Sequence, residues 1–141
     1  MSNFVEKLQV FLESRKIFKN WYIFPKIYFR LSKKKFSIFE TKSGMKIMIR
    51  TDSTDLMALT NVWMINEYNI DDYGITENDT VIDIGAHIGL FSLRVSNFCT
   101  KGKIFSYEPI KDNFECLISN LKLNQLEHVL AFNLAVSSDS S

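Results

Sequence analysis

A glycine turn near the middle of the chain combines residue types that suit a bound ligand. The stretch VIDIGAHIGLFSL, residues 81 to 93, runs from apolar residues into Asp83, passes Gly85 and Gly89, and resumes as an apolar segment. Gly85 permits a sharp turn without a Cβ in the path of a ligand, and Gly89 permits a helix to pack tightly on a strand. Asp83 offers a carboxylate to an amino group or an ordered water. The pattern predicts a ligand site where a strand passes into a helix.

A second acidic residue indicates what kind of ligand binds there. Glu108 follows Asp83 by twenty-five residues in the segment SYEP, where Pro109 ends an apolar run. A carboxylate at the end of a strand can accept hydrogen bonds from both hydroxyls of a ribose. The glycine turn and the acidic strand end together predict a cofactor that contains a nucleoside.

The glycine spacing favours one nucleoside cofactor over another. A dinucleotide fingerprint requires G-x-G-x-x-G, so that a helix N-terminus can hold a pyrophosphate. Here His87 and Leu90 occupy the positions of the second and third glycines. The arrangement D-x-G-x-x-x-G instead suits S-adenosylmethionine, which has no phosphate. An NAD-dependent oxidoreductase stays as an alternative, and no metal ligand set is predicted.

Short apolar strands alternate with amphipathic helices from residue 80 onward. The segments TVIDI, KIFSY and VLAFNLAV are the predicted strands. Apolar residues at helical spacing predict the two intervening helices, through Ile88, Phe91, Val95 and Phe98 and through Phe114, Leu117, Ile118 and Leu121. Such short connections predict an α/β fold with a parallel sheet covered by helices. Asp83 and Glu108 then lie at the carboxyl ends of adjacent strands, where such sheets bind ligands.

Residues 36 to 79 are predicted to form a leader segment with a hairpin and a helix. FSIFE and MKIMIR flank TKSG, which is typical of a β-hairpin with Gly44 in the turn. Ser53 or Thr54 could cap a following helix that ends near Tyr68. The apolar face of that helix is expected to comprise Leu56, Leu59, Trp63 and the stem of Glu67.

Residues 1 to 35 are predicted to form a basic, aromatic helical arm. Residues 1 to 50 carry twelve Lys or Arg against three acids (+9), and residues 51 to 141 carry five against thirteen (−8), which gives the net +1. The arm could pack on the rest of the protein, or touch a membrane surface or another anionic partner. The run from Lys33 to Lys35 is too short by itself to indicate nucleic acid, so no nucleic-acid partner is predicted.

Length and composition are typical of one soluble domain. The chain has 141 residues, of which 46% are hydrophobic. Cys99 and Cys116 lack the spacing of a zinc or redox motif and are expected to be reduced thiols. No apolar run approaches the ~20 residues that span a bilayer, and Glu6 and Lys7 stand where a signal peptide would need apolar residues. A cytoplasmic protein is expected, with its oligomeric state left open.

Three segments resemble class I S-adenosylmethionine-dependent methyltransferases, and among these the FkbM type. They are VIDIGAHIGLFSL, GKIFSYEPIKDNFECLISNLKLN and VLAFNLAVSS. Members of that type show a D-x-G-A-(Asn or His)-x-G loop, an E-P pair at a strand end and an L-x-x-N-L-x-L-N helix. The segment TDSTDLMALTNVWMINEY, upstream of the loop, is also similar, so the resemblance covers roughly residues 45 to 138.

The resemblance implies roles for the site residues and a substrate class. It implies a Rossmann-like sheet that binds S-adenosylmethionine, with Glu108 at the ribose and residues 133 to 137, beginning with Asn133, near the adenine. The methionine end of the cofactor would be lined by Asp83, Gly85, Ala86, His87 and Gly89. The acceptor would be a hydroxyl of a small molecule, such as a sugar, a glycan or a polyketide-like compound.

The predicted sheet is incomplete by comparison with that family. A complete class I methyltransferase has seven strands, whereas residues 80 to 141 supply the first three. The first strand would then have an unpaired edge, which buried parallel strands do not tolerate well. We therefore expect this chain to be part of a longer enzyme, to expose apolar surface and to bind the cofactor weakly. A non-catalytic cofactor-binding module and a membrane-surface adaptor are the remaining alternatives.

Overall fold

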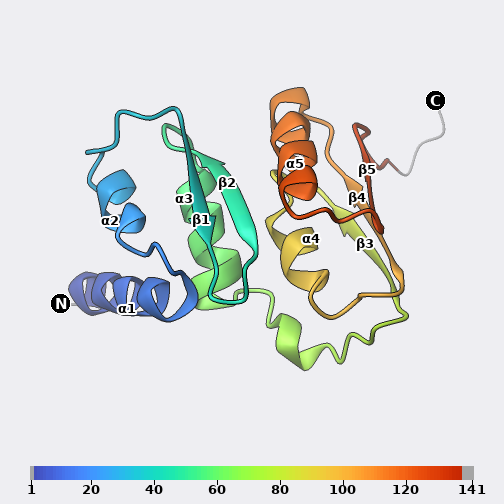
Figure 1. Cartoon of the computed structure of the whole chain (residues 1–141), viewed down its shortest axis with the longest axis horizontal. Helices are drawn as coiled ribbons and strands as arrows, with labels where there is room; N and C mark the ends of the chain where they lie inside the picture. The colour runs from blue at the N-terminus through green and yellow to red at the C-terminus, as the bar shows by residue number, and fades with distance from the viewer. Residues whose placement is uncertain (1, 138–141) are drawn as a thin grey trace. The chain divides into compact units, whose positions relative to one another are not determined.

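The fold consists of two compact units, Met1–Tyr68 (unit 1) and Asn69–Ser141 (unit 2). The structure is a computed structural model (Figure 1) and describes the backbone of residues 2–137 and the side chains of residues 8–137. The predicted arm and most of the predicted leader lie together in unit 1, and unit 2 begins before Thr80. The three-part division of the chain stays a prediction. Among the described helices, none is long and apolar enough to cross a membrane.

Unit 1 packs helices against a β-hairpin. Its elements are α1 (Ser2–Ile17), α2 (Ile23–Tyr28), β1 (Phe36–Glu40), β2 (Lys46–Arg50), α3 (Asp55–Leu59) and the π-helix η1 (Thr60–Ile65). β1 and β2 pair antiparallel with Phe36 opposite Arg50, and Gly44 takes a φ of +97° in the turn, which favours glycine. The predicted hairpin is confirmed.

Alternating side chains of the hairpin form the core of unit 1. Phe39, Ile47 and Ile49 are buried from the two strands, and the Phe18 ring at the end of α1 lies 5.0 Å from the Phe39 ring. The alternation is the two-residue period of a sheet with one buried face. Strand β1 of the predicted leader therefore packs against the end of α1 in the predicted arm.

The predicted helix after the hairpin differs from the observed one. Asp55, fully buried, begins α3 and accepts bidentate hydrogen bonds of 2.9 and 2.8 Å from the Arg50 guanidinium. The helix then widens into η1 at Thr60, whose hydroxyl donates to the Leu56 carbonyl oxygen at 2.8 Å. A π-turn rotates the following residues around the axis, so Val62 and Met64 are buried instead of Trp63. The segment ends at Ile65, before the predicted Tyr68.

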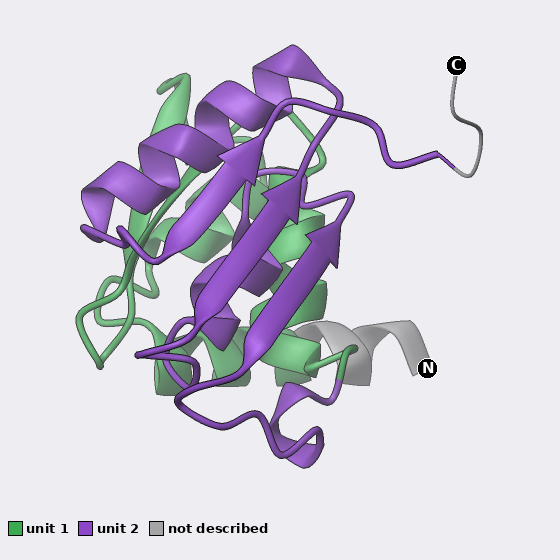
Figure 2. Ribbon diagram, turned by 90° about the vertical axis from the view of Figure 1, so that its right-hand side faces the viewer, with its two compact units in different colours: residues 1–68 green, residues 69–141 purple. Residues whose placement is uncertain are grey.

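Unit 2 is a parallel three-stranded sheet with helices on one face (Figure 2). Its elements are the 3₁₀ turn η2 (Ile70–Asp72), β3 (Thr80–Ile84), α4 (Leu90–Val95), β4 (Lys103–Tyr107), α5 (Lys111–Leu123) and β5 (Val129–Phe132). The strand order is β3-β4-β5, and all pairs are parallel. The predicted fold class is confirmed. The third strand is shorter than predicted, because the chain leaves the ladder at Asn133.

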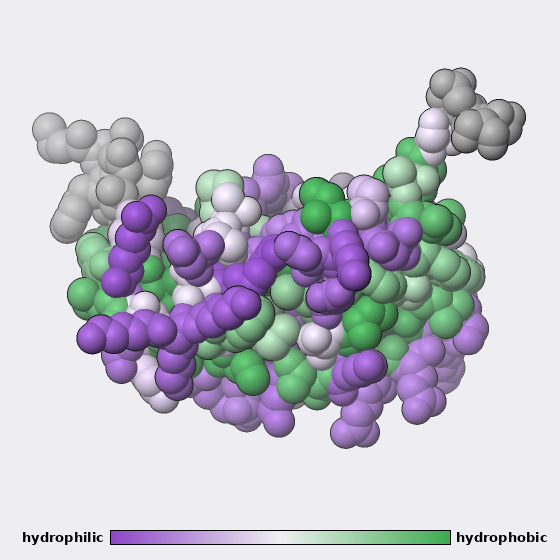
Figure 3. Space-filling model, turned by 90° about the horizontal axis from the view of Figure 1, so that it is seen from above, coloured by the Kyte–Doolittle hydropathy of each residue, from purple (hydrophilic) through white to green (hydrophobic). Residues whose placement is uncertain are grey.

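The other face of this sheet is open among the described residues, and it is apolar. Ile82 and Ile84 of the edge strand β3 are 62% and 64% exposed. The register places Phe105 beside Ile82 and Tyr107 beside Ile84, and Phe132 stacks on both aromatic rings. Hydrophobic patches also reach the surface in the space-filling view (Figure 3). The exposed apolar surface expected from the sequence is present.

Candidate functional site

The glycine loop lies at the carboxyl ends of β3 and β4. The register pairs Asp83 with Ser106 and Ile84 with Tyr107, the last residues of the two strands. The backbone N–H groups of Gly85 and Ala86 both donate to the Tyr107 carbonyl oxygen at 2.9 Å. The loop is therefore tied to the neighbouring strand end at its first two residues, and Ala86 itself is buried.

The two glycines of the loop serve different purposes. Gly85 has a φ of +77°, and a Cβ placed on it would meet no atom within 4 Å, which leaves room for a ligand. Gly89 has a φ of +87°, and a Cβ there would lie 2.4 Å from Leu117 Cδ1. The sequence pattern predicted that Gly89 permits packing on a strand. The structure instead shows a close approach of the start of α4 to α5.

Asp83 is a buried carboxylate within a chain of hydroxyl groups. Its Oδ2 accepts a hydrogen bond of 2.5 Å from Ser92 Oγ, and the hydroxyls of Ser92 and Ser106 lie 2.7 Å apart. Burial raises the pKa of Asp83, the Ser92 hydrogen bond opposes that rise, and the negative charge of Glu108 adds to it. Asp83 is thus a carboxylate whose charge costs free energy unless a cation or a donor meets it.

Glu108 holds the glycine loop and the start of α5 with both carboxylate oxygens. Oε2 accepts from the His87 backbone N–H at 2.7 Å, and Oε1 accepts from the Ile110 N–H at 2.9 Å and from Asn113 Nδ2 at 3.3 Å. A carboxylate offers about four lone-pair sites, so roughly one is left for a ligand. Glu108 can bind one ribose hydroxyl in this arrangement, whereas its place in the sequence predicted that it binds two.

His87 and Asn133 each donate a hydrogen bond that helps to hold the site together. His87 takes a φ of +53° and contributes its backbone N–H to Glu108. Asn133 donates through Nδ2 to the carbonyl oxygens of Glu108 at 2.8 Å and Pro109 at 3.1 Å. Both residues lie at the predicted edge of the sheet. A contact of Asn133 with an adenine stays a prediction.

The residues at the strand ends fit the predicted cofactor. Asp83 and Glu108 are 8% and 4% exposed, and in the described part of the chain no Lys or Arg forms an ion pair with either carboxylate. Two neighbouring buried carboxylates favour a cationic, donor-rich ligand. S-adenosylmethionine has an ammonium, a sulfonium and ribose hydroxyls, and the open Gly85 leaves room for it. A phosphate would be repelled here.

Four polar residues of the site were not predicted from the sequence. Ser92 and Ser106 support Asp83, and Asn113 supports Glu108. Asn120 is fully buried in α5 and donates to the Ile88 carbonyl oxygen at 2.9 Å. One feature of the sequence could have identified these residues. Each is a polar residue at a position where the apolar spacing of its strand or helix predicts a buried side chain.

We expect Asn120→Ala to destabilise unit 2. The substitution leaves the buried Ile88 carbonyl without its side-chain donor, which costs about 1–3 kcal/mol. Urea unfolding followed by circular dichroism measures the loss of unfolding free energy. Asn97→Ala is a matched control, because Asn97 Nδ2 donates to the Arg94 carbonyl oxygen on an exposed surface. Equal losses in the two variants would contradict the role given to Asn120.

A protein-family comparison assigns the fold and the loop to one family. The family model described as the TRM5/TYW2 methyltransferase domain matches residues 42–140. The chain belongs to the TRM5/TYW2 methyltransferase domain family. That membership confirms the predictions of a methyltransferase and of S-adenosylmethionine as its cofactor. No curated protein matches the chain in the sequence comparison.

Solved structures share the fold of this TRM5/TYW2 family member. Methanocaldococcus jannaschii TYW2 in complex with AdoMet matches with a TM-score of 0.57 and 22% identity, over 74% of this chain and 45% of that one. Pyrococcus horikoshii TYW2 in complex with MeSAdo matches with 0.53 and 17%, over 74% and 38%. The M. jannaschii tRNA m1G37 methyltransferase matches with 0.53 and 21%, over 74% and 31%. The chain thus spans less than half the length of each.

The family corrects the predicted partner. The sequence resemblance implied a sugar, glycan or polyketide-like acceptor, and no nucleic acid was expected. The matched family and the solved tRNA methyltransferase overturn that expectation. The matches support the class I methyltransferase and give no support to the FkbM type. The error has a physical reason: the glycine loop and Glu108 are the residues predicted to bind the cofactor, and they carry no information on the acceptor.

Proposed function

We propose that this chain is the cofactor-binding part of an S-adenosylmethionine-dependent methyltransferase that acts on RNA. The observation that carries the proposal is the pair of buried carboxylates, Asp83 and Glu108, beside the open glycine loop. Family membership supports the same reaction. The chain spans less than half the length of its solved relatives. We therefore assign the rest of the acceptor site to residues outside this chain.

Each site residue has a part in holding the cofactor. Asp83 attracts the ammonium group, Glu108 accepts from a ribose hydroxyl, and Gly85 leaves space above the loop. S-adenosylmethionine supplies an electrophilic methyl group on a sulfonium. The protein aligns this group with an acceptor, and proximity and orientation can supply ~7–11 kcal/mol of the barrier. No nucleophilic side chain is required.

Photochemical cross-linking tests the cofactor assignment. We expect tritiated S-adenosylmethionine to label the chain under ultraviolet light, with the label between residues 83 and 133. Excess S-adenosylhomocysteine should remove the label, and excess NADH should leave it. Equal competition by NADH would favour the dinucleotide alternative. Absence of label at millimolar cofactor, or label in unit 1, would contradict the cofactor site.

An RNA acceptor is supported by the family and by the charge of the chain. Residues 1 to 50 carry a net charge of +9, and the solved relatives include a tRNA methyltransferase. We expect the chain to bind a transcribed tRNA in fluorescence anisotropy, with an affinity that falls as salt increases. No binding at low salt would contradict the RNA acceptor.

A further inference from the structure

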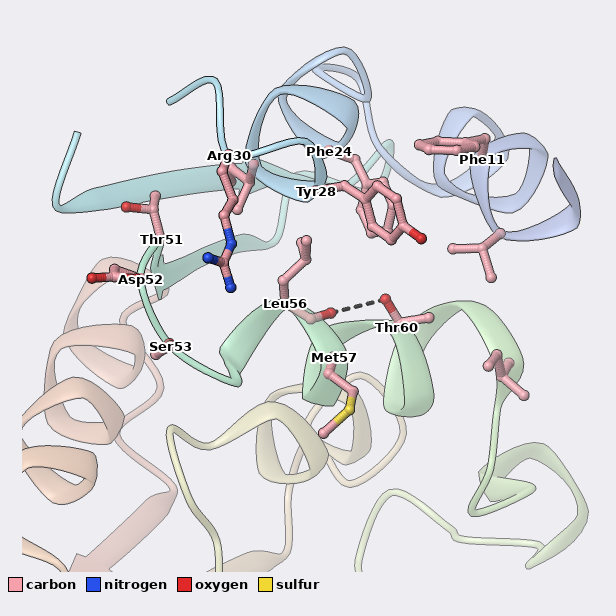
Figure 4. Close-up of a pocket in the computed structure, with 13 residues that line it drawn as sticks. Phe11, Phe24, Tyr28, Arg30, Thr51, Asp52, Ser53, Leu56, Met57 and Thr60 are labelled. Carbon is pink, nitrogen blue, oxygen red and sulfur yellow. Dashed lines mark hydrogen bonds between the residues drawn. The ribbon is translucent and has the colours of Figure 1, made fainter. Parts of the chain in front are cut away.

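Unit 1 contains a cavity that the cofactor site does not use (Figure 4). Its volume is about 480 Å³, within the range of small-molecule sites. The walls are largely apolar and come from α1, α2 and α3, through Phe11, Phe24, Tyr28, Leu56 and Met57. A flat, uncharged group of the size of a nucleobase fits such a space.

Aromatic rings form one wall of this cavity. Phe24 is 2% exposed, and its ring is nearly parallel to that of Tyr28, with 6.2 Å between centroids. Phe11 contacts both rings edge-on, at 5.5 and 5.6 Å. Tyr28 also meets the Phe29 ring nearly at right angles, with 5.1 Å between centroids, and it is 39% exposed, so part of its ring is accessible from the cavity. An aromatic face of this kind accepts a stacked base of any sequence.

A cationic hollow lies next to this cavity. An adjoining hollow of about 440 Å³ shares Ile27, Arg30, Thr51 and Asp52 with the cavity and adds Ser32 and the three lysines of residues 33 to 35. The walls of this hollow therefore include four basic side chains and one acidic side chain, that of Asp52. The Arg30 guanidinium points into the cavity (Figure 4). Within the described residues, neither Arg30 nor Lys33 nor Lys34 forms an ion pair, so these charges are available to an anion.

We propose that unit 1 binds an unpaired nucleotide of RNA, with its base in the aromatic cavity and the neighbouring phosphates on Arg30 and residues 33 to 35. This inference rests on the proposed RNA acceptor. Stacking on Tyr28 holds the base, and the guanidinium pairs with phosphate oxygens through directed hydrogen bonds. The three lysines are consecutive in the loop between α2 and β1, and they contact successive phosphates of the RNA strand.

A membrane surface is the rival partner for a basic, aromatic region. Membrane anchoring relies on apolar side chains that protrude into the lipid. Phe29 and Leu31 do protrude, at 60% and 71% exposed, but Phe24 is recessed and the aromatic cluster lines a hollow. A recessed aromatic cavity beside a cationic hollow receives an inserted group, so this shape favours the nucleotide.

Replacement of the lysines tests the phosphate contacts. We expect K33A/K34A/K35A to weaken the binding of a short single-stranded RNA at least tenfold, and to reduce the salt slope of the affinity by about 2. The matched control is K101A/K111A/K122A in unit 2, which removes the same charge from three exposed lysines. Equal losses in the two triple variants would show a dependence on net charge alone and would overturn the inference.

Replacement of Tyr28 tests the base contact. Tyr28→Leu keeps an apolar side chain but removes the π face, and we expect about a tenfold loss of affinity. Tyr28→Phe keeps the face and should bind as the unchanged chain does. Thermal unfolding of both variants shows whether unit 1 stays folded. Unchanged binding by a folded Tyr28→Leu chain would overturn the placement of the base.

The outcomes separate this inference from the proposed function. If the unchanged chain binds no RNA, the RNA acceptor is wrong and the inference falls with it. If the chain binds RNA and the unit 1 variants bind as tightly as the control, the inference alone is wrong.

Phosphatidylglycerol vesicles are the second probe, and they test the membrane alternative. Tighter binding to vesicles than to RNA, with the same loss in K33A/K34A/K35A, would assign the region to membranes.

Discussion

Gly89→Ala should lower the unfolding free energy of unit 2 by about 2–5 kcal/mol. The φ of +87° at Gly89 costs a residue with a Cβ about 1–2 kcal/mol. The new Cβ would also lie 2.4 Å from Cδ1 of Leu117, which is fully buried. The leucine cannot move into solvent, so overpacking adds roughly 1–3 kcal/mol.

Gly85→Ala is the matched control for this prediction. Gly85 has a similar φ of +77° but no atom within 4 Å of an added Cβ, so only the backbone cost of about 1–2 kcal/mol applies. Circular dichroism or amide exchange must follow unit 2, because Trp21 and Trp63, the two tryptophans, both lie in unit 1. Equal losses in both variants would contradict the close packing of α4 on α5.

Asp83→Asn should abolish most of the affinity for S-adenosylhomocysteine without destabilising the fold. The carboxylate is buried and unpaired by any basic side chain among the described residues, so the ligand ammonium is its expected counter-ion. Loss of one charge-assisted contact costs about 1.5–3 kcal/mol, or roughly 10- to 150-fold in the dissociation constant. The amide oxygen of the substituted side chain can still accept the Ser92 hydrogen bond, which keeps the local structure.

The pH dependence of the same variant follows from the raised pKa of Asp83. A carboxyl whose pKa is raised by folding binds more protons when folded, so its ionisation destabilises the fold at neutral pH. This cost declines as the pH falls from the raised pKa towards the ordinary pKa of an aspartate. We therefore expect Asp83→Asn to melt at the same or a higher temperature than the unchanged chain at neutral pH. The difference should shrink in mild acid.

Ligand affinity should show the opposite trend with pH. The unchanged chain binds the ammonium through an ionised Asp83, so its affinity should fall as the pH is lowered through the raised pKa. The affinity of Asp83→Asn should not fall in this way, because the substituted amide does not titrate. Titrations of both proteins over mildly acidic to neutral pH measure this. A pH-independent affinity of the unchanged chain would contradict the ammonium contact.

The sequence predicted those parts of the fold that depend on local patterns. Alternating apolar residues and Gly44 predicted the hairpin, and three short apolar runs predicted the parallel sheet. The π-turn at Thr60, where the Thr60 hydroxyl donates to the Leu56 carbonyl oxygen, was not predictable, because the apolar spacing of the segment is also that of a regular helix. In the structure Val62 and Met64 are buried, and Trp63 is only partly buried.

The site was predictable only where its residues stand in a sequence motif. Asp83, Gly85 and Glu108 do so, and the structure brings them to one edge of the sheet. The hydrogen bonds from Asp83 to Ser92 and from Ser92 to Ser106 join β3, α4 and β4, so no single segment contains them. In unit 1, residues 33 to 35 gave no nucleic-acid signal alone. Their convergence with Arg30 and the aromatic cavity requires the folded hairpin.

The central claim is that the glycine loop and its two carboxylates bind S-adenosylmethionine. The most direct measurement is a titration of the ¹⁵N-labelled chain with S-adenosylhomocysteine, followed by amide chemical shifts. We predict weak binding in fast exchange, with shifts at residues 83 to 89, at residues 108 to 113 and at Asn133, and with unit 1 unchanged. Absence of shifts at millimolar ligand, or shifts confined to unit 1, would contradict it.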